Sequence, residues 1–284
     1  MIVDSHCHIF TEQIIQNVSS NSALVESIKL DVEHAQQRLD PKALDQSAAA
    51  NGVEICLLLP TAAPSKVRAE NDRHLRFTSQ SPRLRSLATL HPAMQDLSDE
   101  IRRVFHLGIV GFKFSSFSQR FDLISREVED MLSVLERSGS DSGIRPVVAL
   151  DTFTRADIHF GANRDHLTTP AKLAEIAHRH PEIDFMGAHM GGLAADPYEL
   201  LHELTPAANL YLDTSNAAHT LTRGEFIQLL KMHGPYHILF GTDWPWFHHA
   251  AEILKIRSLL EEAGYNESEQ EAVFGENACK LFRF

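Results

Sequence analysis

The feature of this 284-residue sequence that most restricts its fold is a rhythm of short apolar runs separated by amphipathic stretches. The runs are rich in β-branched residues and lie at 2–9, 53–60, 84–91, 109–114, 145–152, 183–189, 209–215 and 237–243. Helical periodicity and helix-start signals predict helices at 41–50, 65–80, 97–107, 126–137, 170–180 and 222–233, with two more at the end. Buried strands that alternate with helices predict a parallel sheet and the α/β class. We therefore expect one domain over residues 1–284, a (β/α)8 TIM barrel.

Two segments lie outside this rhythm. Residues 10–40 are polar and mixed, which predicts a long loop after the first strand, with one or two short helices over the mouth of the barrel. The chain closes with an extra helix, whose start we place at Ser268-x-x-Glu271. Thr222-x-x-Glu225 resembles a capping box and predicts a helix start at that position.

Bulk composition excludes several classes of partner. The net charge of −12 has the wrong sign for a protein that binds nucleic acid. No apolar run is long enough to cross a bilayer, and no signal peptide opens the chain. Three cysteines far apart in sequence are typical of a reduced protein. We expect a cytoplasmic protein without a membrane partner that acts on a small molecule.

The first apolar run carries two histidines, His6 and His8. Side chains of a strand alternate between its faces, so both imidazoles point the same way. Two imidazoles on one face form half of a tetrahedral metal site, although an edge strand with two solvated histidines has the same pattern. Cys7 faces the opposite side and is expected to be a small core residue rather than a third ligand.

Ionisable residues also end the six later strands of the predicted barrel. They are His91, Lys113, Asp151, His189, Asp213 and Asp243. Because barrel chemistry lies at the carboxyl ends of the strands, and because buried charges need partners, this distribution predicts a site at one rim. Structural alternatives exist: His189 could be a hydrogen-bonded core histidine, Asp243 a turn cap, and Asp213 a carboxylate bonded to backbone amides. For Lys113 we favour an ion pair over carbamylation between two metals.

Several ordered motifs resemble the amidohydrolase superfamily, in its branch of TIM-barrel metal-dependent hydrolases that includes the aminocarboxymuconate-semialdehyde decarboxylase type. They are the segments 3–8, 111–114, 187–192, 209–215, 240–245 and 275–278. The resemblance implies that His6 and His8 bind a divalent metal, usually zinc. It implies that His189 is a further ligand or polarises the substrate, and that Asp243 contacts the metal and shuttles a proton. Relatives are often dimers, so the resemblance leaves a homodimer open.

One departure from this family concerns the fifth strand. Where relatives place a metal-binding histidine soon after a Pro-Val pair, this chain has Leu150 with Asp151 beside it. Alternation allows only one of the two to face the site unless the strand bulges. An inward Asp151 would supply an oxygen ligand, whereas an inward Leu150 would remove a ligand.

We expect the protein to hydrolyse an amide, lactone or ester bond with water activated by one divalent ion, Zn²⁺ before Mn²⁺. The catalytic residues would be Asp243 and His189, and the candidate ligands are His6, His8, Asp243, His189 and Asp151. Lys113, His91 and Arg155 are the candidate substrate-binding residues. The alternative is non-oxidative decarboxylation of an unsaturated or aromatic acid at the same site. A second alternative is an inactive barrel that acts as a binding protein, which an inward Leu150 would favour.

Overall fold

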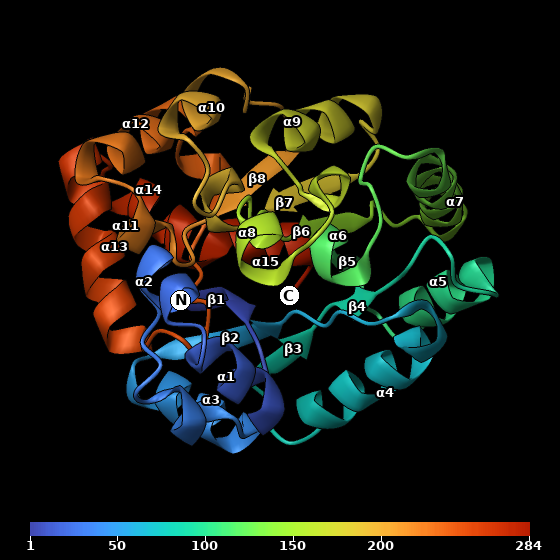
Figure 1. The fold of residues 1–284 in the computed structure, drawn as a ribbon, viewed down its shortest axis with the longest axis horizontal. Helices are drawn as coiled ribbons and strands as arrows, with labels where there is room; N and C mark the ends of the chain where they lie inside the picture. The colour runs from blue at the N-terminus through green and yellow to red at the C-terminus, as the bar shows by residue number, and fades with distance from the viewer.

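The computed structural model describes all 284 residues, and its strands form a ring at the centre of the molecule (Figure 1). The strands are β1 (Ile2–Cys7), β2 (Val53–Leu58), β3 (Leu84–Ser86), β4 (Ala88–Thr89), β5 (Gly111–Phe114), β6 (Val147–Leu150), β7 (Asp184–Gly187), β8 (Leu210–Asp213) and β9 (Ile238–Leu239). They pair in parallel, in the orders β1-β2-β3 and β4-β5-β6-β7-β8-β9. Every strand lies inside a predicted run, so the α/β class with parallel pairing is confirmed.

Backbone hydrogen bonds join the two sheets. β3 and β4 are consecutive pieces of one segment, interrupted at Leu87, whose N–H donates to a carbonyl of β2 (3.0 Å). On the other side, the N–H of Ser5 donates to the carbonyl of Phe240 (2.9 Å), and that of His8 to the carbonyl of Trp244 (2.8 Å). β1 is therefore hydrogen-bonded to the segment that follows β9, and the third predicted strand is divided in two.

Helices surround the strands (Figure 1). They are α1 (Glu12–Ser19), α2 (Ser22–Ser27), α3 (Pro41–Ala50), α4 (Val67–Thr78), α5 (Leu97–His106), α6 (Ser116–Gln119), α7 (Arg126–Ser142), α8 (Ala156–Phe160), α9 (Pro170–Arg179), α10 (Pro197–His202), α11 (Ala217–Thr220), α12 (Arg223–His233), α13 (His249–Ala263), α14 (Glu267–Glu271) and α15 (Asn277–Phe282). None of them combines the length and the apolar composition that crossing a membrane requires.

Alternation along the strands separates two apolar cores. Val147 and Ala149 of β6 belong to a cluster of strand residues that fills the interior of the ring. Val148 and Leu150 belong to a larger cluster, which the strands share with the surrounding helices. One face of each strand therefore points into the ring and the other packs against helices, as expected for a barrel.

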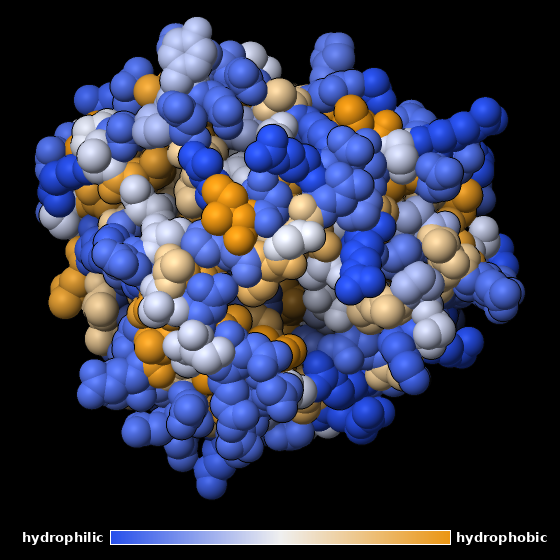
Figure 2. Space-filling view, in the orientation of Figure 1, coloured by the Kyte–Doolittle hydropathy of each residue, from blue (hydrophilic) through white to orange (hydrophobic).

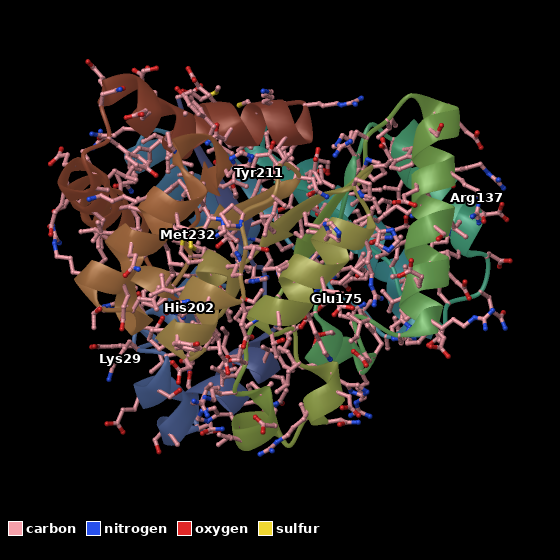
Figure 3. The ribbon with its side chains drawn as sticks, turned by 90° about the horizontal axis from the view of Figure 1, so that it is seen from above. Lys29, Arg137, Glu175, His202, Tyr211 and Met232 are labelled. Carbon is pink, nitrogen blue, oxygen red and sulfur yellow. The ribbon has the colours of Figure 1, made fainter.

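Different elements cover the two ends of the ring. Ile15 of α1 and Leu24 of α2 pack with Phe153 and Trp246, which follow β6 and β9. At the other end, Leu281 of α15 packs with the interior cluster. In Figure 3 the blue helices α1 and α2 lie at one end of the molecule and the red C-terminal helices at the opposite end. The prediction that short helices after the first strand cover the mouth is confirmed.

Local signals fix the helix starts. The predicted capping box of Thr222 and Glu225 opens α12, with both reciprocal hydrogen bonds in place. The predicted start at Ser268 is wrong, because Asn266 caps α14 and forms a capping box with Glu269. The predicted start used a Ser-x-x-Glu pattern, which lies two residues after the Asn-x-x-Glu pattern that caps the helix.

Candidate metal centre

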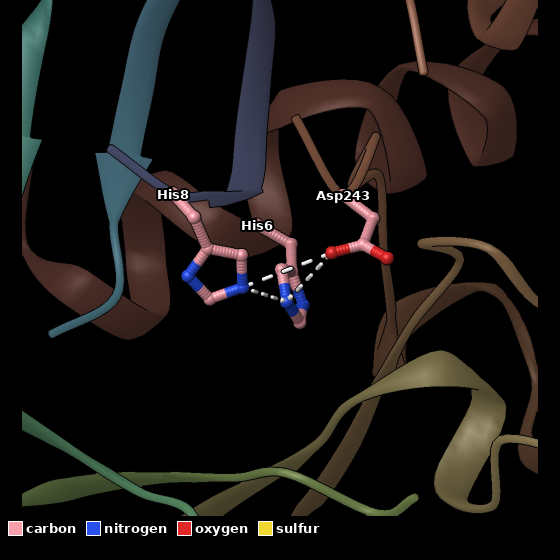
Figure 4. Close-up of side chains that lie close together, drawn as sticks. All are labelled: His6, His8 and Asp243. Carbon is pink, nitrogen blue, oxygen red and sulfur yellow. Dashed lines mark hydrogen bonds and ion pairs between the residues drawn. The ribbon is translucent and has the colours of Figure 1, made fainter. Parts of the chain in front are cut away.

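Three of the predicted ligands meet where β1 and β9 end. Nε2 of His6 lies 3.0 Å from Nε2 of His8, and Oδ1 of Asp243 lies 3.6 Å from the first and 3.7 Å from the second. Figure 4 shows the three side chains pointing at one another. The backbone holds them there, because the N–H of Asp243 donates to the carbonyl of His6 (3.0 Å). Asp243 has a φ of 62°, a left-handed conformation that Asp adopts more readily than most residues.

Hydrogen bonds from Nδ1 leave Nε2 of His6 and of His8 without a hydrogen atom. Nδ1 of His6 donates to Oδ2 of Asp213 (2.8 Å), and Nδ1 of His8 donates to the carbonyl of Leu59 (3.2 Å). A neutral imidazole carries one N–H, so Nε2 of each ring presents a lone pair. Burial lowers the pKa of His8 well below its usual value, which keeps that ring neutral.

Asp213 binds surrounding groups of the site with both carboxylate oxygens. Its Oδ1 accepts the backbone N–H groups of His189 (3.0 Å) and Ser215 (3.0 Å) as well as the Ser215 hydroxyl, while Oδ2 accepts from His6. Although burial opposes it, the His6 contact lowers the pKa of Asp213. A carboxylate that receives the second N–H of a metal-binding histidine is a common feature of metal sites, since it orients the ring.

His189 follows β7 and lies beside His6, with ring centroids 4.8 Å apart. Its Nδ1 donates to the carbonyl of Ser215 (2.9 Å), so its Nε2 also presents a lone pair. Burial lowers the pKa of His189 to about 4, so the imidazole is neutral at pH 7. His189 can therefore accept a proton or bind a cation, but cannot supply positive charge.

Two observations test whether these residues fit a divalent cation. Two lone pairs 3.0 Å apart repel each other unless a proton or a cation lies between them. In a tetrahedral zinc site with bonds of 2.0–2.1 Å, ligand atoms lie about 3.3 Å apart. The separations of 3.0, 3.6 and 3.7 Å among the atoms of His6, His8 and Asp243 bracket that value. The residues fit a metal ion.

Asp151, rather than Leu150, faces the inside of the barrel. Leu150 is fully buried in the cluster shared with the helices, whereas Asp151 lines a pocket together with His8 and Lys113. Asp151 also lies near enough to His189 and Asp243 to influence the pKa of both. An inward Leu150, the feature that would have favoured an inactive barrel, is therefore absent.

Lys113 departs from the ion pair that we predicted. Its side chain is buried on β5, and Nζ has no hydrogen-bond partner and no carboxylate within 4.0 Å. Burial lowers the pKa of this ammonium group, while the nearby carboxylates of Asp151, Asp213 and Asp243 oppose the shift. A buried cation with unused donors, next to the metal-site residues, is suited to bind an anionic ligand.

Two predicted substrate-binding residues lie outside the pocket. Nε2 of His91 donates to the carbonyl of Gln119 (2.8 Å), and its Nδ1 accepts the N–H of Ala93 (3.0 Å), so both nitrogens serve the backbone. Arg155 is exposed and donates to the carbonyl of Ala194 (3.3 Å). A position at the end of a strand did not bring either side chain into the pocket, because both side chains donate to backbone carbonyls elsewhere.

The sequence did not indicate the role of Asp4. Its Oδ1 accepts the N–H groups of His6 (3.1 Å) and Thr242 (3.0 Å), and its Oδ2 lies 3.1 Å from Nε2 of His249. Strict alternation would place Asp4 on the same face as His6, but the pairing register of β1 shifts between Asp4 and Cys7. Cys7 lies in the core, as predicted. His249 is fully buried as well.

A pocket of about 440 Å³ opens next to this site. His8, Lys113 and Asp151 line one part of it, and Phe10 and Phe117 contribute apolar walls. Figure 2 shows a hollow near the centre of the face covered by α1 and α8, bordered by hydrophobic side chains. A partly apolar cavity with a few convergent polar groups is the usual form of a small-molecule site.

Comparison with solved structures supports the fold. A 5-carboxyvanillate decarboxylase from Novosphingobium aromaticivorans, solved with manganese, has a TM-score of 0.70 and 16% identity, over 100% of this chain and 96% of that one. A 2,6-dihydroxybenzoate decarboxylase from Rhizobium has a TM-score of 0.68 and 18% identity, over 99% and 98%. An amidohydrolase from Burkholderia multivorans, solved with zinc, has a TM-score of 0.70 and 13% identity, over 100% and 99%.

No curated protein matches the chain. The model of the family described as Amidohydrolase does match, over residues 3–284. The match confirms the family resemblance that the sequence motifs indicated. The chain belongs to the amidohydrolase family.

Proposed function

We propose that the protein is a metal-dependent decarboxylase of a small aromatic or unsaturated carboxylic acid. This was the alternative in the sequence analysis, and the decarboxylases among the structural relatives now support it better than hydrolysis. The observation that carries the proposal is Lys113, a buried cation with no partner at the pocket end occupied by His8 and Asp151. A substrate carboxylate there would accept the hydrogen bonds that Nζ of Lys113 does not make within the protein.

Each residue would have a defined part in this reaction. The side chains of His6, His8 and Asp243 would hold the ion, with Asp151 and His189 beside them. The bound ion would act as a Lewis acid toward a substrate oxygen. Lys113 would bind the carboxylate, and the walls of Phe10 and Phe117 would hold the planar part of the substrate.

Asp243 is suited to be the proton donor. Burial raises its pKa to about 7 in the site without an ion, and a bound ion would lower this pKa. Asp243 would therefore relay a proton from water through Oδ2, because Oδ1 is the oxygen that lies next to His6 and His8. Its proton would pass to the carbon that bears the carboxylate. The bond between that carbon and the carboxyl group then breaks, its electron pair stays on the ring or chain carbon, and CO₂ leaves. Water would return the proton to Asp243.

The test uses protein reconstituted with Zn²⁺ or Mn²⁺ and a panel of aromatic and unsaturated acids, with CO₂ release as the measurement. We expect Asp243→Asn to lower kcat at least ~100-fold, since it removes a general acid. Lys113→Gln should mainly raise KM. Lys66→Gln, on an exposed residue, is the matched control and should change neither constant. Absence of CO₂ release from every acid would exclude the proposal for this panel.

Hydrolysis of an amide, lactone or ester remains the second candidate, because the Burkholderia relative is described as an amidohydrolase with zinc. Asp243 would then accept a proton from the attacking water and return it to the leaving group. Turnover of lactones or amides without CO₂ release from acids would favour this reading. The metal content of the purified protein distinguishes both metal-dependent reactions from a binding protein. Less than about a tenth of a metal ion per chain, with no gain in activity on adding metal, would contradict a metalloenzyme.

A further inference from the structure

The pocket wall contributed by α4 has no part in the proposed reaction. Glu70, Arg73 and His74 lie on this helix and line the same pocket as His8 and Lys113. Helix α4 follows β2, whereas the metal-site residues come from β1 and from the segments after β6, β7 and β9. The pocket therefore has two polar regions that are supplied by different elements.

Arg73 is held in place but keeps unused donors. Its Nη2 binds Oε1 of Glu70, and the same oxygen lies 3.2 Å from Nε2 of His74. The guanidinium lies against the ring of Phe77, with Cζ 5.4 Å from the centroid. Nη1 makes no hydrogen bond or ion pair, and Nε is buried without a partner. Oε1 of Glu70 is therefore contacted by both Arg73 and His74, whereas Arg73 can still donate to another acceptor.

Aromatic side chains also line the pocket. Phe10 stacks on His8, with ring centroids 4.7 Å apart and planes inclined by 16°. Phe117 and Phe160 stack on each other at 5.9 Å, with planes 7° apart. All three line the pocket. Planar apolar walls favour a flat substrate, and the cations Lys113 and Arg73 favour acidic groups on it.

We propose that Arg73 is a specificity-determining residue, which binds a second carboxylate of the substrate away from the carboxylate that Lys113 binds. The inference rests on the proposed function, and it assigns the substrate to the planar dicarboxylic acids. Nη1 of Arg73 would donate the charge-assisted hydrogen bond, while Glu70 and His74 keep the guanidinium oriented.

Binding, rather than turnover, tests this inference. The probes are benzene-1,3- and 1,4-dicarboxylate and the matching carbamoylbenzoates, in which a neutral amide of similar size replaces one carboxylate. Their dissociation constants are measured by calorimetry on protein loaded with Zn²⁺ or Mn²⁺ and on metal-free protein. For at least one of the two isomers we expect the dicarboxylate to bind about tenfold more tightly than its amide.

Substitutions on one helix complete the test. Arg73→Gln should bring the ratio between dicarboxylate and amide to about one, and Arg73→Lys should retain part of it. Arg76→Gln, on an exposed arginine of the same helix that does not line the pocket, should leave the ratio unchanged. A wild-type ratio of one for both isomers, or an unchanged ratio in Arg73→Gln, would overturn the inference.

These outcomes are separable from those of the proposed reaction. Selective binding of the dicarboxylates without CO₂ release would defeat the decarboxylase and leave the role of Arg73 intact. Release of CO₂ from monocarboxylic acids, with equal binding of dicarboxylate and amide, would defeat the role of Arg73 alone.

Discussion

The buried pair of Asp4 and His249 makes stability depend on pH in a way that can be measured. Neither side chain is exposed, and Oδ2 of Asp4 lies 3.1 Å from Nε2 of His249. Nδ1 of His249 lies 2.8 Å from the hydroxyl of Ser47. Burial lowers the pKa of His249, but the contact with Asp4 outweighs it and raises the pKa to about 9. His249 is therefore protonated in the folded protein at neutral pH.

The sign and size of the effect follow from this shift. A folded-state pKa raised above the unfolded value of about 6.5 contributes stability that is fully present below pH 6.5 and is lost as the pH rises through about 9. A rise of this size corresponds to about 3 kcal/mol of unfolding free energy. Breaking a buried ion pair by removing one partner destabilises a protein by about 3–5 kcal/mol, which is a similar amount.

The assay is urea unfolding of the wild type and of His249→Gln between pH 6.5 and 9.5. Other groups titrate in this range, so the informative quantity is the difference in unfolding free energy between the two proteins. We expect the wild-type advantage to shrink by about 3 kcal/mol across the range. His106→Gln, on an exposed histidine of α5, is the control and should show no such trend. A difference that does not change with pH would refute the assignment of a charged pair.

Three further predictions concern the metal site. Asp213→Asn should weaken metal binding about 10–100-fold, because His6 loses its anionic partner; competition with a chelator measures this. Leu150→Ala should lower the unfolding free energy by about 2–5 kcal/mol and leave metal affinity unchanged, and a loss of affinity would contradict its outward orientation. Zn²⁺ or Mn²⁺ at 100 times its dissociation constant should raise the unfolding free energy by about 2.7 kcal/mol. His8→Ala should abolish most of that gain.

The barrel could be predicted because its signals are local and repeated. Each apolar run is long enough for one strand, and the helices between the runs have their own start signals. The interruption of the third strand at Leu87 could not be predicted, because it depends on pairing with β2 on one side and β5 on the other. A pairing partner is not encoded in the run itself.

The site was predictable only where a side chain follows its strand directly. His6, His8 and Asp243 meet as the strand order requires, whereas His91 turns toward the carbonyl of Gln119 at the end of α6. Asp4 was missed because the register shift within β1 directs its side chain toward His249 of α13 rather than toward the imidazole of His6. Arg73 was missed because no pattern in α4 indicates which side of the helix borders a pocket.

The carboxylate of Asp151 affects the charge of the site and therefore its affinity for a divalent ion. Asp151 lines the pocket directly after β6, so the site carries one more negative charge than a neutral side chain there would give it. The carboxylates of Asp151, Asp213 and Asp243 outnumber the single ammonium of Lys113 by two, which is the charge of one divalent ion. Without that ion, burial raises the pKa of Asp243 to about 7, and the negative charges of Asp213 and Asp151 add to this shift. The extra carboxylate therefore favours a cation, and oxygen ligands suit Mn²⁺ as well as Zn²⁺.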